Sequence, residues 1–232
     1  SDLETIFWTK QRDGHSLKGE VKPWYQAHIH SDEYEPYYWK RLDKFWRDYS
    51  VLPIDSVRST DKVTDEIMDC IGNPKDEASW KQRGLVMGHV QSGKTTNYSA
   101  LITKAADAGY RIIIVLAGLT NSLRKQTQER LDETFVGKSS LGDEFNIEVY
   151  PVSMVFAGME NEPQIPKHPY CATTQRADFS IAQTRGVGAS EGNFADPVLF
   201  VTKKHESVLR RLTEWLSGLR QDGPIEGDRK SV

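Results

Sequence analysis

The stretch that most constrains this chain is Gly88-His89-Val90-Gln91-Ser92-Gly93-Lys94-Thr95, which fits the phosphate-binding pattern G-x-x-x-x-G-K-S/T at every fixed position. Its glycines let backbone N–H groups turn inward around phosphate oxygens. In such loops the lysine, here Lys94, contacts the β- and γ-phosphates, and the hydroxyl of Thr95 binds Mg²⁺. We therefore predict a site for ATP and Mg²⁺, with Lys94 and Thr95 as its catalytic residues. The predicted nucleotide-binding residues are Gly88, Gln91, Ser92, Gly93, Lys94, Thr95 and Thr96.

Apolar runs on both sides of the loop predict a strand–loop–helix–strand unit. Gly84-Leu85-Val86-Met87 predicts a short buried strand before the loop, and residues 111–117 predict a second strand. Between them, apolar residues at helical spacing predict a helix that ends near Gly109. The N-terminal dipole of this helix would point at the bound anion. A chance match in a glycine-containing loop is the alternative, and the agreement of motif, strands and helix argues against it.

Further apolar runs extend this pattern toward the C-terminus. Strands are predicted at residues 147–152 and 198–201, and a helix at residues 120–135. Residues 157–196, rich in Gly, Pro, Gln and Ser, are predicted to form a long connection. The fold class is therefore predicted as α/β, with residues 81–232 forming part of a parallel-sheet P-loop NTPase lobe.

Residues 1–80 differ in composition and predict a helical, aromatic-rich N-terminal region packed on the nucleotide-binding lobe. Four of the six tryptophans of the chain lie in the first fifty residues. A helix that Pro36 opens would place Tyr38 and Trp46 on one apolar face, and a second helix is predicted near residues 62–71. Aromatic rows can stack nucleic-acid bases. The amphipathic helical spacing favours core packing instead.

The segment after the second strand carries a candidate nucleic-acid contact. Thr120 and Asn121 are predicted at the start of a helix that follows the carboxyl end of the strand, with Arg124 one turn later. A helix N-terminus can receive a backbone phosphate there while arginine neutralises its charge. An ordinary solvated helix with a Thr or Asn cap fits the same residues equally well. Lys203-Lys204-His205 forms a basic cluster after the last strand, where a solvated charge run is the alternative.

Composition excludes several other classes of protein. With a net charge of −3 the chain as a whole is not a polycation, so a contact with DNA requires a local patch of positive charge. Cys70 and Cys171 are isolated and suggest neither a zinc site nor a disulfide framework, which fits the reducing cytoplasm. No apolar run has the length of a membrane span, so we expect no membrane partner. Possible metal ligands occur at every second position in His28-Ile29-His30-Ser31-Asp32. The sequence shows no second cluster of ligand residues that would complete a metal site with them.

A hydrolysing P-loop enzyme also needs an acidic side chain after a neighbouring strand, to hold Mg²⁺ and orient water. No apolar run in this sequence ends in such a residue, since residues 112–116 lead to Ala117-Gly118 and residues 198–201 lead to Thr202-Lys203. These residues leave two alternatives, that the enzyme is degenerate or that this chain is a fragment.

The block Arg83-Gly84-Leu85-Val86-Met87-Gly88-His89-Val90-Gln91-Ser92-Gly93-Lys94-Thr95-Thr96-Asn97-Tyr98 closely resembles the Z-one domain family. These are bacterial superfamily-two helicase-like P-loop ATPases that are described as endonucleases. The resemblance spans about residues 40–232 and continues through Lys104-Ala105-Ala106-Asp107-Ala108-Gly109-Tyr110, Ile113-Ile114-Val115-Leu116-Ala117-Gly118, Asn121, Leu123-Arg124, Gln126-Thr127-Gln128, Arg130-Leu131-Asp132 and Val201-Thr202-Lys203-Lys204.

This resemblance implies an ATP-dependent DNA translocase or helicase with two RecA-like lobes, from a bacterial restriction or antiphage defence system. Residues 81–232 would then be part of the first RecA-like lobe. The resemblance also implies an acidic strand soon after Val232, so we expect the carboxylates to lie outside these 232 residues, which alone would bind nucleotide weakly and not turn it over. It implies methyltransferases, nucleases and GHKL-type ATPases as partners, and DNA contacts by Thr120, Asn121 and Arg124. The residues show no paired carboxylates with a lysine that would support nuclease chemistry. Two other classes stay open, a P-loop kinase or small-molecule NTPase and a non-catalytic nucleotide-binding module. DNA versus RNA and the polarity of movement are not determined by these residues.

Overall fold

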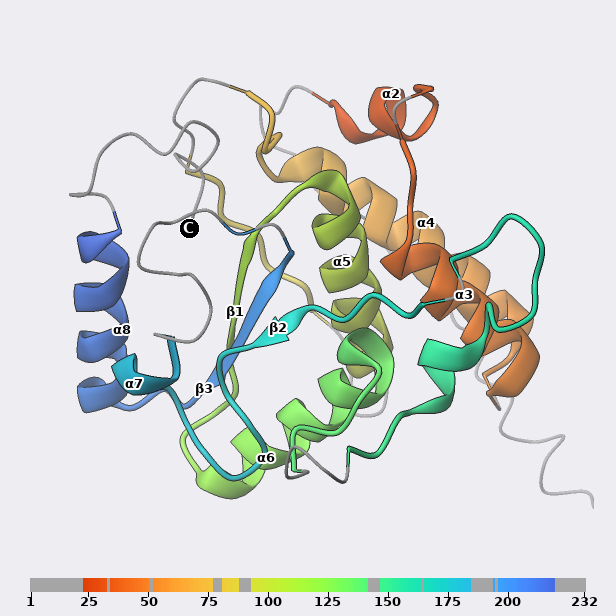
Figure 1. The fold of residues 1–232 in the computed structure, drawn as a ribbon. Helices are drawn as coiled ribbons and strands as arrows, with labels where there is room; N and C mark the ends of the chain where they lie inside the picture. Colours follow the sequence, from red (N-terminus) through yellow and green to blue (C-terminus); the bar gives the residue numbers. More distant parts are fainter. Residues whose placement is uncertain are drawn as a thin grey trace, which may run out of the picture.

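The computed structural model describes residues 23–32, 34–50, 52–76, 81–87, 93–141, 147–163, 165–184, 194 and 196–219. These residues form an α/β structure in which a small parallel sheet lies between helices (Figure 1). The sheet contains β1 (Ile112–Leu116), β2 (Tyr170–Cys171) and β3 (Val198–Thr202), in the order β1-β3-β2. The α/β class and the strands predicted at residues 111–117 and 198–201 are therefore confirmed.

The central strand, β3, is buried along its whole length, as its unbroken apolar sequence requires. It pairs in parallel with β1 from Ile112↔Val198 to Leu116↔Thr202. Strand β1 pairs with β3 on one side, and its side chains are partly exposed.

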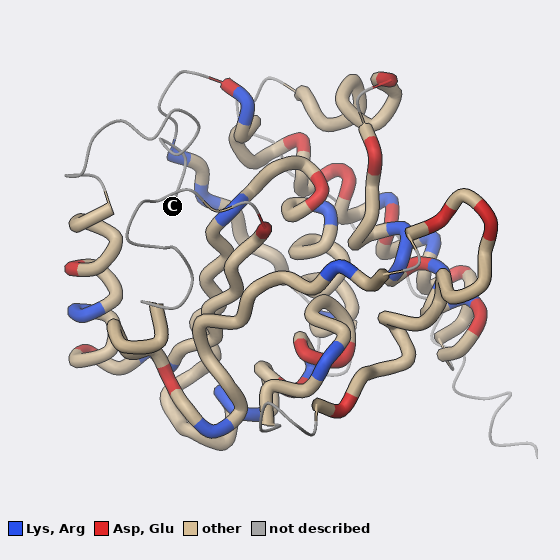
Figure 2. Tube along the Cα trace, in the orientation of Figure 1, with Lys and Arg blue, Asp and Glu red and all other residues tan. Residues whose placement is uncertain are grey.

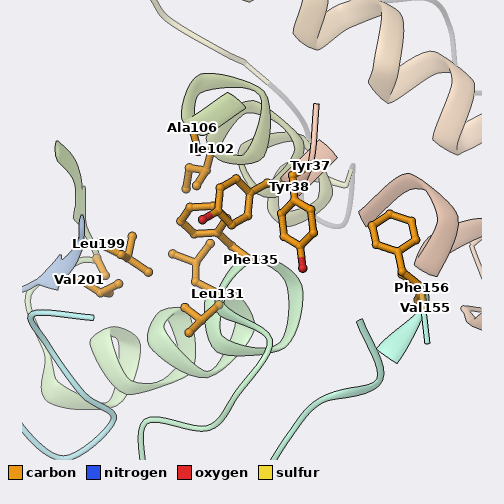
Figure 3. Close-up of a cluster of buried hydrophobic side chains, with 12 residues drawn as sticks. Tyr37, Tyr38, Ile102, Ala106, Leu131, Phe135, Val155, Phe156, Leu199 and Val201 are labelled. Atoms are coloured by element: carbon orange, nitrogen blue, oxygen red, sulfur yellow. The ribbon is translucent and has the colours of Figure 1, made fainter. Parts of the chain in front are cut away.

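Alternate side chains of these strands enter two different cores, because successive residues of a strand point to opposite faces. One core packs Leu199 and Val201 against α5 (Lys94–Ala108) and the region of α6 (Asn121–Leu131), as Figure 3 shows. The other core packs Val198 and Phe200 against α8 (Glu206–Gly218). The apolar faces of α5 and α8 thus cover the two faces of one sheet.

The helices that precede α5 are α2 (Tyr25–Ile29), α3 (Tyr38–Tyr49) and α4 (Ile54–Cys70). The prediction of a helix near residues 62–71 located α4 but placed its start too late. Ser, Thr and Asp in residues 55–61 resemble capping residues in sequence. In the structure this first part of α4 is helical because Val57 packs in a core with Leu42, Trp46 and Ala100.

The strand predicted for residues 84–87 is not formed in the structure. Residues 81–87 have no assigned helix or strand, and Leu85 and Met87 are 82% and 85% exposed. An apolar run becomes a strand only where a neighbouring strand pairs with its N–H and C=O groups. No such pairing is present for residues 84–87 among the described residues.

The strand predicted for residues 147–152 is also wrong. Val149 forms a single antiparallel bridge with Lys138, and a 3₁₀ helix, η2 (Pro151–Met154), follows. Pro151 has no backbone N–H and a fixed φ, so it suits the start of a helix and interrupts a strand ladder. The π-helical turn η1 (Asp132–Val136) extends α6, which confirms the helix predicted for residues 120–135.

The predicted long connection at residues 157–196 contains two short elements that the sequence did not reveal. These are β2 and α7 (Ile181–Thr184). None of the helices in the described part of the chain is long and apolar enough to cross a membrane.

Polar side chains of α5 attach the preceding helices to it. Lys104 is buried and places its Nζ 2.6 Å from an Asp61 carboxylate oxygen and 2.5 Å from one of Asp65, both on α4. The same Nζ lies 4.4 Å from the ring centroid of Trp39 on α3. Because a buried ammonium must be paired, Lys104 fixes α4 and α3 against α5.

Asp107 of α5 caps the N-terminus of α3 from outside the helix. Its carboxylate accepts hydrogen bonds from the backbone N–H groups of Tyr37, Tyr38 and Trp39 at 2.9, 2.9 and 2.7 Å. These N–H groups have no partner within the helix, so the carboxylate satisfies donors that would otherwise lack one. Burial raises the pKa of Asp107 from 3.8 to about 6, although the three hydrogen bonds oppose this shift.

We expect Asp107 to make the fold less stable as the pH rises from about 4 to about 7. Its pKa is higher in the folded protein, so its stabilising contribution is complete below the unfolded pKa and is lost as the pH passes about 6. The free energy of unfolding of the wild type, relative to that of Asp107→Asn, falls by about 2 kcal/mol over this range. Urea unfolding of both proteins at several pH values measures the change. A difference that stays constant with pH would contradict it.

Candidate nucleotide-binding site

Helix α5 begins at the residues that the motif assigns to nucleotide phosphates. Its N-cap, Gly93, has a φ of 77°, a left-handed conformation that side-chain-bearing residues rarely adopt. Lys94 and Thr95 are the first two residues of the helix and both are exposed, while Thr96 is partly exposed. The first N–H groups of a helix have no intrahelical partner and carry its positive dipole end. This end of α5 therefore combines anion-attracting amides with an ammonium and a hydroxyl.

The structure describes only the second half of the predicted loop. Gly88, Gln91 and Ser92 lie outside the described residues, whereas Gly93 and the residues that follow it lie inside. The structure therefore places Lys94, Thr95 and Thr96 together at the start of α5.

The start of α5 lies toward the carboxyl end of the parallel sheet. Helix α5 and β1 run in opposite directions and are joined by residues 109–111. The first turn of α5 and the carboxyl end of β1 therefore lie at the same end of the sheet (Figure 1). The ends of β1 and β3 meet there, since Lys204 donates its N–H to the carbonyl of Gly118 at 2.7 Å. Ligands of open α/β sheets bind at this edge.

Gly118 is required at the turn that leads from β1 into α6. Its φ is 69°, and a Cβ at this position would lie 2.9 Å from Cδ1 of Leu123. The turn places Thr120 and Asn121, which are both exposed, beside the end of β1. The Thr120 hydroxyl accepts a hydrogen bond from the N–H of Leu123 at 3.2 Å and caps α6. Thr120 thus has the capping role that was the alternative to a nucleic-acid contact, and Asn121 lies exposed beside it.

Arg124 does not lie where a contact to DNA would need it. Its side chain is 2% exposed, and its guanidinium donates hydrogen bonds to the carbonyls of Thr174 and Gln175 at 2.7 and 2.9 Å. Burial lowers the pKa of Arg124. Arg124 therefore holds residues 174–175 against α6. A contact between this helix and a nucleic-acid strand would have to use Thr120 and Asn121 instead.

A buried polar row on α6 continues this connection. Gln128 accepts a hydrogen bond from the Thr173 hydroxyl at 2.8 Å and donates one to Asp132 at 2.9 Å. Asp132 also accepts one from the side chain of Gln175 at 3.1 Å, and burial raises its pKa. Arg124, Gln128 and Asp132 are spaced by four residues, so they share one face of the helix. The spacing could have shown from sequence that they share a face, whereas their burial is visible only in the structure.

Basic residues are grouped around the start of α6 and the end of β3. Figure 2 shows Lys and Arg positions around α6, at the lower end of the view. Lys125 and Lys204 are exposed, whereas the Nζ of Lys203 lies 3.8 Å from a carboxylate oxygen of Asp178. This end of the sheet therefore carries exposed positive charge, although the net charge of the chain is −3.

A metal ion at the start of α5 would have the Thr95 hydroxyl as a possible protein ligand. Among the described residues no group of three or more His, Cys, Asp and Glu side chains could hold a metal ion. Thr95 offers one hydroxyl oxygen at the start of α5. Mg²⁺ accepts such an arrangement, because it binds few protein oxygens and takes its other ligands from water and substrate phosphates.

Comparisons with protein-family models, with curated proteins and with solved structures give no match to this chain. The observed sheet and helices are compatible with part of a Rossmann-like or P-loop-like lobe.

Proposed function

We propose that this chain is the ATP-binding N-terminal part of an ATP-dependent DNA translocase or helicase of a bacterial restriction or antiphage defence system. The observation that carries this proposal is the start of α5, where Gly93 turns the chain and Lys94 and Thr95 are exposed in the first turn. The position of this turn at the carboxyl edge of a parallel sheet supports a phosphate site. The class of motor comes from the resemblance of the surrounding block to the Z-one domain family.

In this proposal each residue at the start of α5 has a separate task. The ammonium of Lys94 stabilises negative charge that develops on the transferred phosphoryl group. Backbone N–H groups of residues 91–95 hold the phosphates, and the Thr95 hydroxyl is a magnesium ligand. The magnesium ion, when bound, neutralises charge on the β- and γ-phosphate oxygens.

DNA is the proposed partner at the neighbouring edge of the sheet. Asn121 is exposed at the N-terminus of α6, and Lys125 and Lys204 add positive charge nearby. Amide side chains and helix N-termini contact phosphate oxygens, which positions a nucleic acid without reading its sequence. Methyltransferases, nucleases and GHKL-type ATPases of the same defence operon are the proposed protein partners, in the cytoplasm.

The proposal predicts that the full-length protein hydrolyses ATP and that DNA accelerates the reaction. In Asn121→Ala, the DNA concentration for half-maximal acceleration rises about tenfold, because a hydrogen bond to a charged phosphate is lost. Steady-state ATP hydrolysis over a DNA titration measures this effect. Thr213→Ala, which changes an exposed residue on α8, is the matched control.

Hydrolysis that no DNA accelerates would refute the motor proposal and favour a P-loop kinase or small-molecule NTPase. Absence of hydrolysis in the full-length protein, with nucleotide still bound, would favour a non-catalytic nucleotide-binding module.

A further inference from the structure

Three exposed leucines lie around the turn that leads from β1 into α6, and we call them the leucine turn. Leu116 ends the strand, Leu119 lies in the turn, and Leu123 is in the first turn of the helix. Their side chains are 43%, 71% and 49% exposed. Single exposed apolar residues are ordinary, whereas a group of them beside polar residues marks a site of interaction.

The backbone of the leucine turn is fixed on both sides of Leu119. Gly118 has a left-handed conformation, and Leu123 packs so close to it that a Cβ there would lie 2.9 Å from Cδ1 of the leucine. The Gly118 carbonyl accepts the N–H of Lys204 at 2.7 Å, and Thr120 caps α6. Binding of a ligand therefore requires little ordering of the turn, which favours affinity.

Positive charge and an amide side chain lie beside the leucine turn. Lys204 is exposed, and its backbone hydrogen bond holds it next to the turn. Asn121 and Lys125 are both exposed and lie four residues apart on α6, so they share one face of the helix. The neighbouring carboxylate of Asp178 lies 3.8 Å from the Nζ of Lys203. A ligand that fits this surface combines apolar groups with negative charge.

A nucleic-acid strand with unstacked bases has both properties. Its phosphates carry the negative charge, and the faces of its bases can contact apolar side chains. In a duplex, stacked neighbours cover these faces. Contacts from amides and lysines to phosphates position a strand without touching its bases, so leucines beside them would recognise a different part of the same molecule.

We propose that the leucine turn contacts the faces of unstacked bases, while Lys125 and Lys204 contact the phosphates of the same strand. The inference rests on the proposed DNA-dependent function and adds to it the part of the DNA that is recognised. A sugar–phosphate backbone without bases then binds more weakly than ordinary DNA, because the leucines have no apolar partner.

Leu119→Ser tests the contact with bases, because it removes the most exposed leucine of the turn. Fluorescence anisotropy on the full-length protein compares a single-stranded oligonucleotide with an abasic one of the same length. In Leu119→Ser the dissociation constant of the ordinary oligonucleotide rises about fivefold, since apolar burial against a base is lost. The dissociation constant of the abasic oligonucleotide is expected to keep its wild-type value.

Two further variants serve as controls. Ile165→Ser changes an isoleucine that is 84% exposed in the segment between η2 and β2, and it is expected to leave both dissociation constants unchanged. Lys204→Ala removes a proposed phosphate contact and is expected to weaken the binding of both oligonucleotides by the same factor.

The outcomes distinguish this inference from the proposed function. A wild-type protein that binds neither oligonucleotide would refute DNA as the partner, and the inference would fall with it. Wild-type binding that Leu119→Ser leaves unchanged for the ordinary oligonucleotide would overturn the inference alone. A lower thermal midpoint in Leu119→Ser, with equal losses for both oligonucleotides, would also overturn it, because another part of the protein would then cover the leucine.

Discussion

Lys94→Ala is expected to lower ATP hydrolysis by the full-length protein about a hundredfold or more. The lysine is exposed in the first turn of α5, where its ammonium can reach the phosphates that the amides of the same turn bind. Its charge acts most strongly on the transition state, because negative charge develops on the transferred group. Steady-state hydrolysis and binding of the ATP analogue measure the two contributions separately.

A matched control for this substitution is Lys62→Ala, which removes an exposed lysine from α4. It is expected to leave hydrolysis and the unfolding midpoint at wild-type values. Because Lys94 is also exposed, its replacement should not lower stability, so a loss of activity can be attributed to the site. Wild-type hydrolysis by Lys94→Ala would remove Lys94 from the catalytic role given to it here.

Gly137→Ala is expected to lower the free energy of unfolding by about 3 kcal/mol or more. Gly137 follows η1 with a φ of 82°, and a Cβ there would lie 1.9 Å from Oγ of Ser153. Ser153 is buried and donates its hydroxyl to the Gly137 carbonyl at 2.7 Å, so it cannot turn away without losing that bond. The same Cβ would lie 3.2 Å from a guanidinium nitrogen of the buried Arg41.

Gly158→Ala provides the control, because it imposes the same backbone strain without the overlap. Gly158 has a φ of 75°, and no atom lies within 4 Å of a Cβ built on it. The strain alone costs about 1–2 kcal/mol. Urea unfolding of the two variants therefore separates strain from steric overlap, and equal losses of stability would show that the contact between η1 and η2 is less tightly packed than the structure indicates.

The tight packing around α5 matters for the proposed site. The helix that presents Lys94 and Thr95 also carries Lys104 and Asp107, which pair with α4 and cap α3. These contacts lie on the part of α5 away from the phosphate end, so the N-terminal helices and the candidate site share one rigid element. The stability variants and the site variants can therefore be distinguished by whether they change unfolding or nucleotide binding.

Local pattern was sufficient to predict several elements. The apolar residues of β1 and β3 could be recognised from sequence because a strand buried beside other strands is apolar at nearly every position. Helix α3 could be recognised because its apolar residues repeat at helical spacing. The motif also predicted the start of α5, since Gly93 marks the turn into the helix.

Other elements depend on partners that are distant in sequence. Residues 84–87 are as apolar as a strand and remain unpaired in the described structure. The opposite case is β2, whose two residues carry no strand pattern and pair because Tyr170 and Cys171 lie opposite Val198 and Leu199. The Thr173 hydroxyl supports this pairing by accepting the N–H of Val201 at 2.8 Å.

The sequence by itself determined the α/β class, the phosphate-binding motif and the residues at the start of α5, because these depend on local spacing and backbone conformation. Only the tertiary structure decided which polar residues are internal. Arg124 resembled a surface contact in sequence, yet it is buried because the carbonyls of Thr174 and Gln175 accept its hydrogen bonds. Burial and pairing over long sequence distances are properties of the folded chain, and a one-dimensional pattern does not contain them.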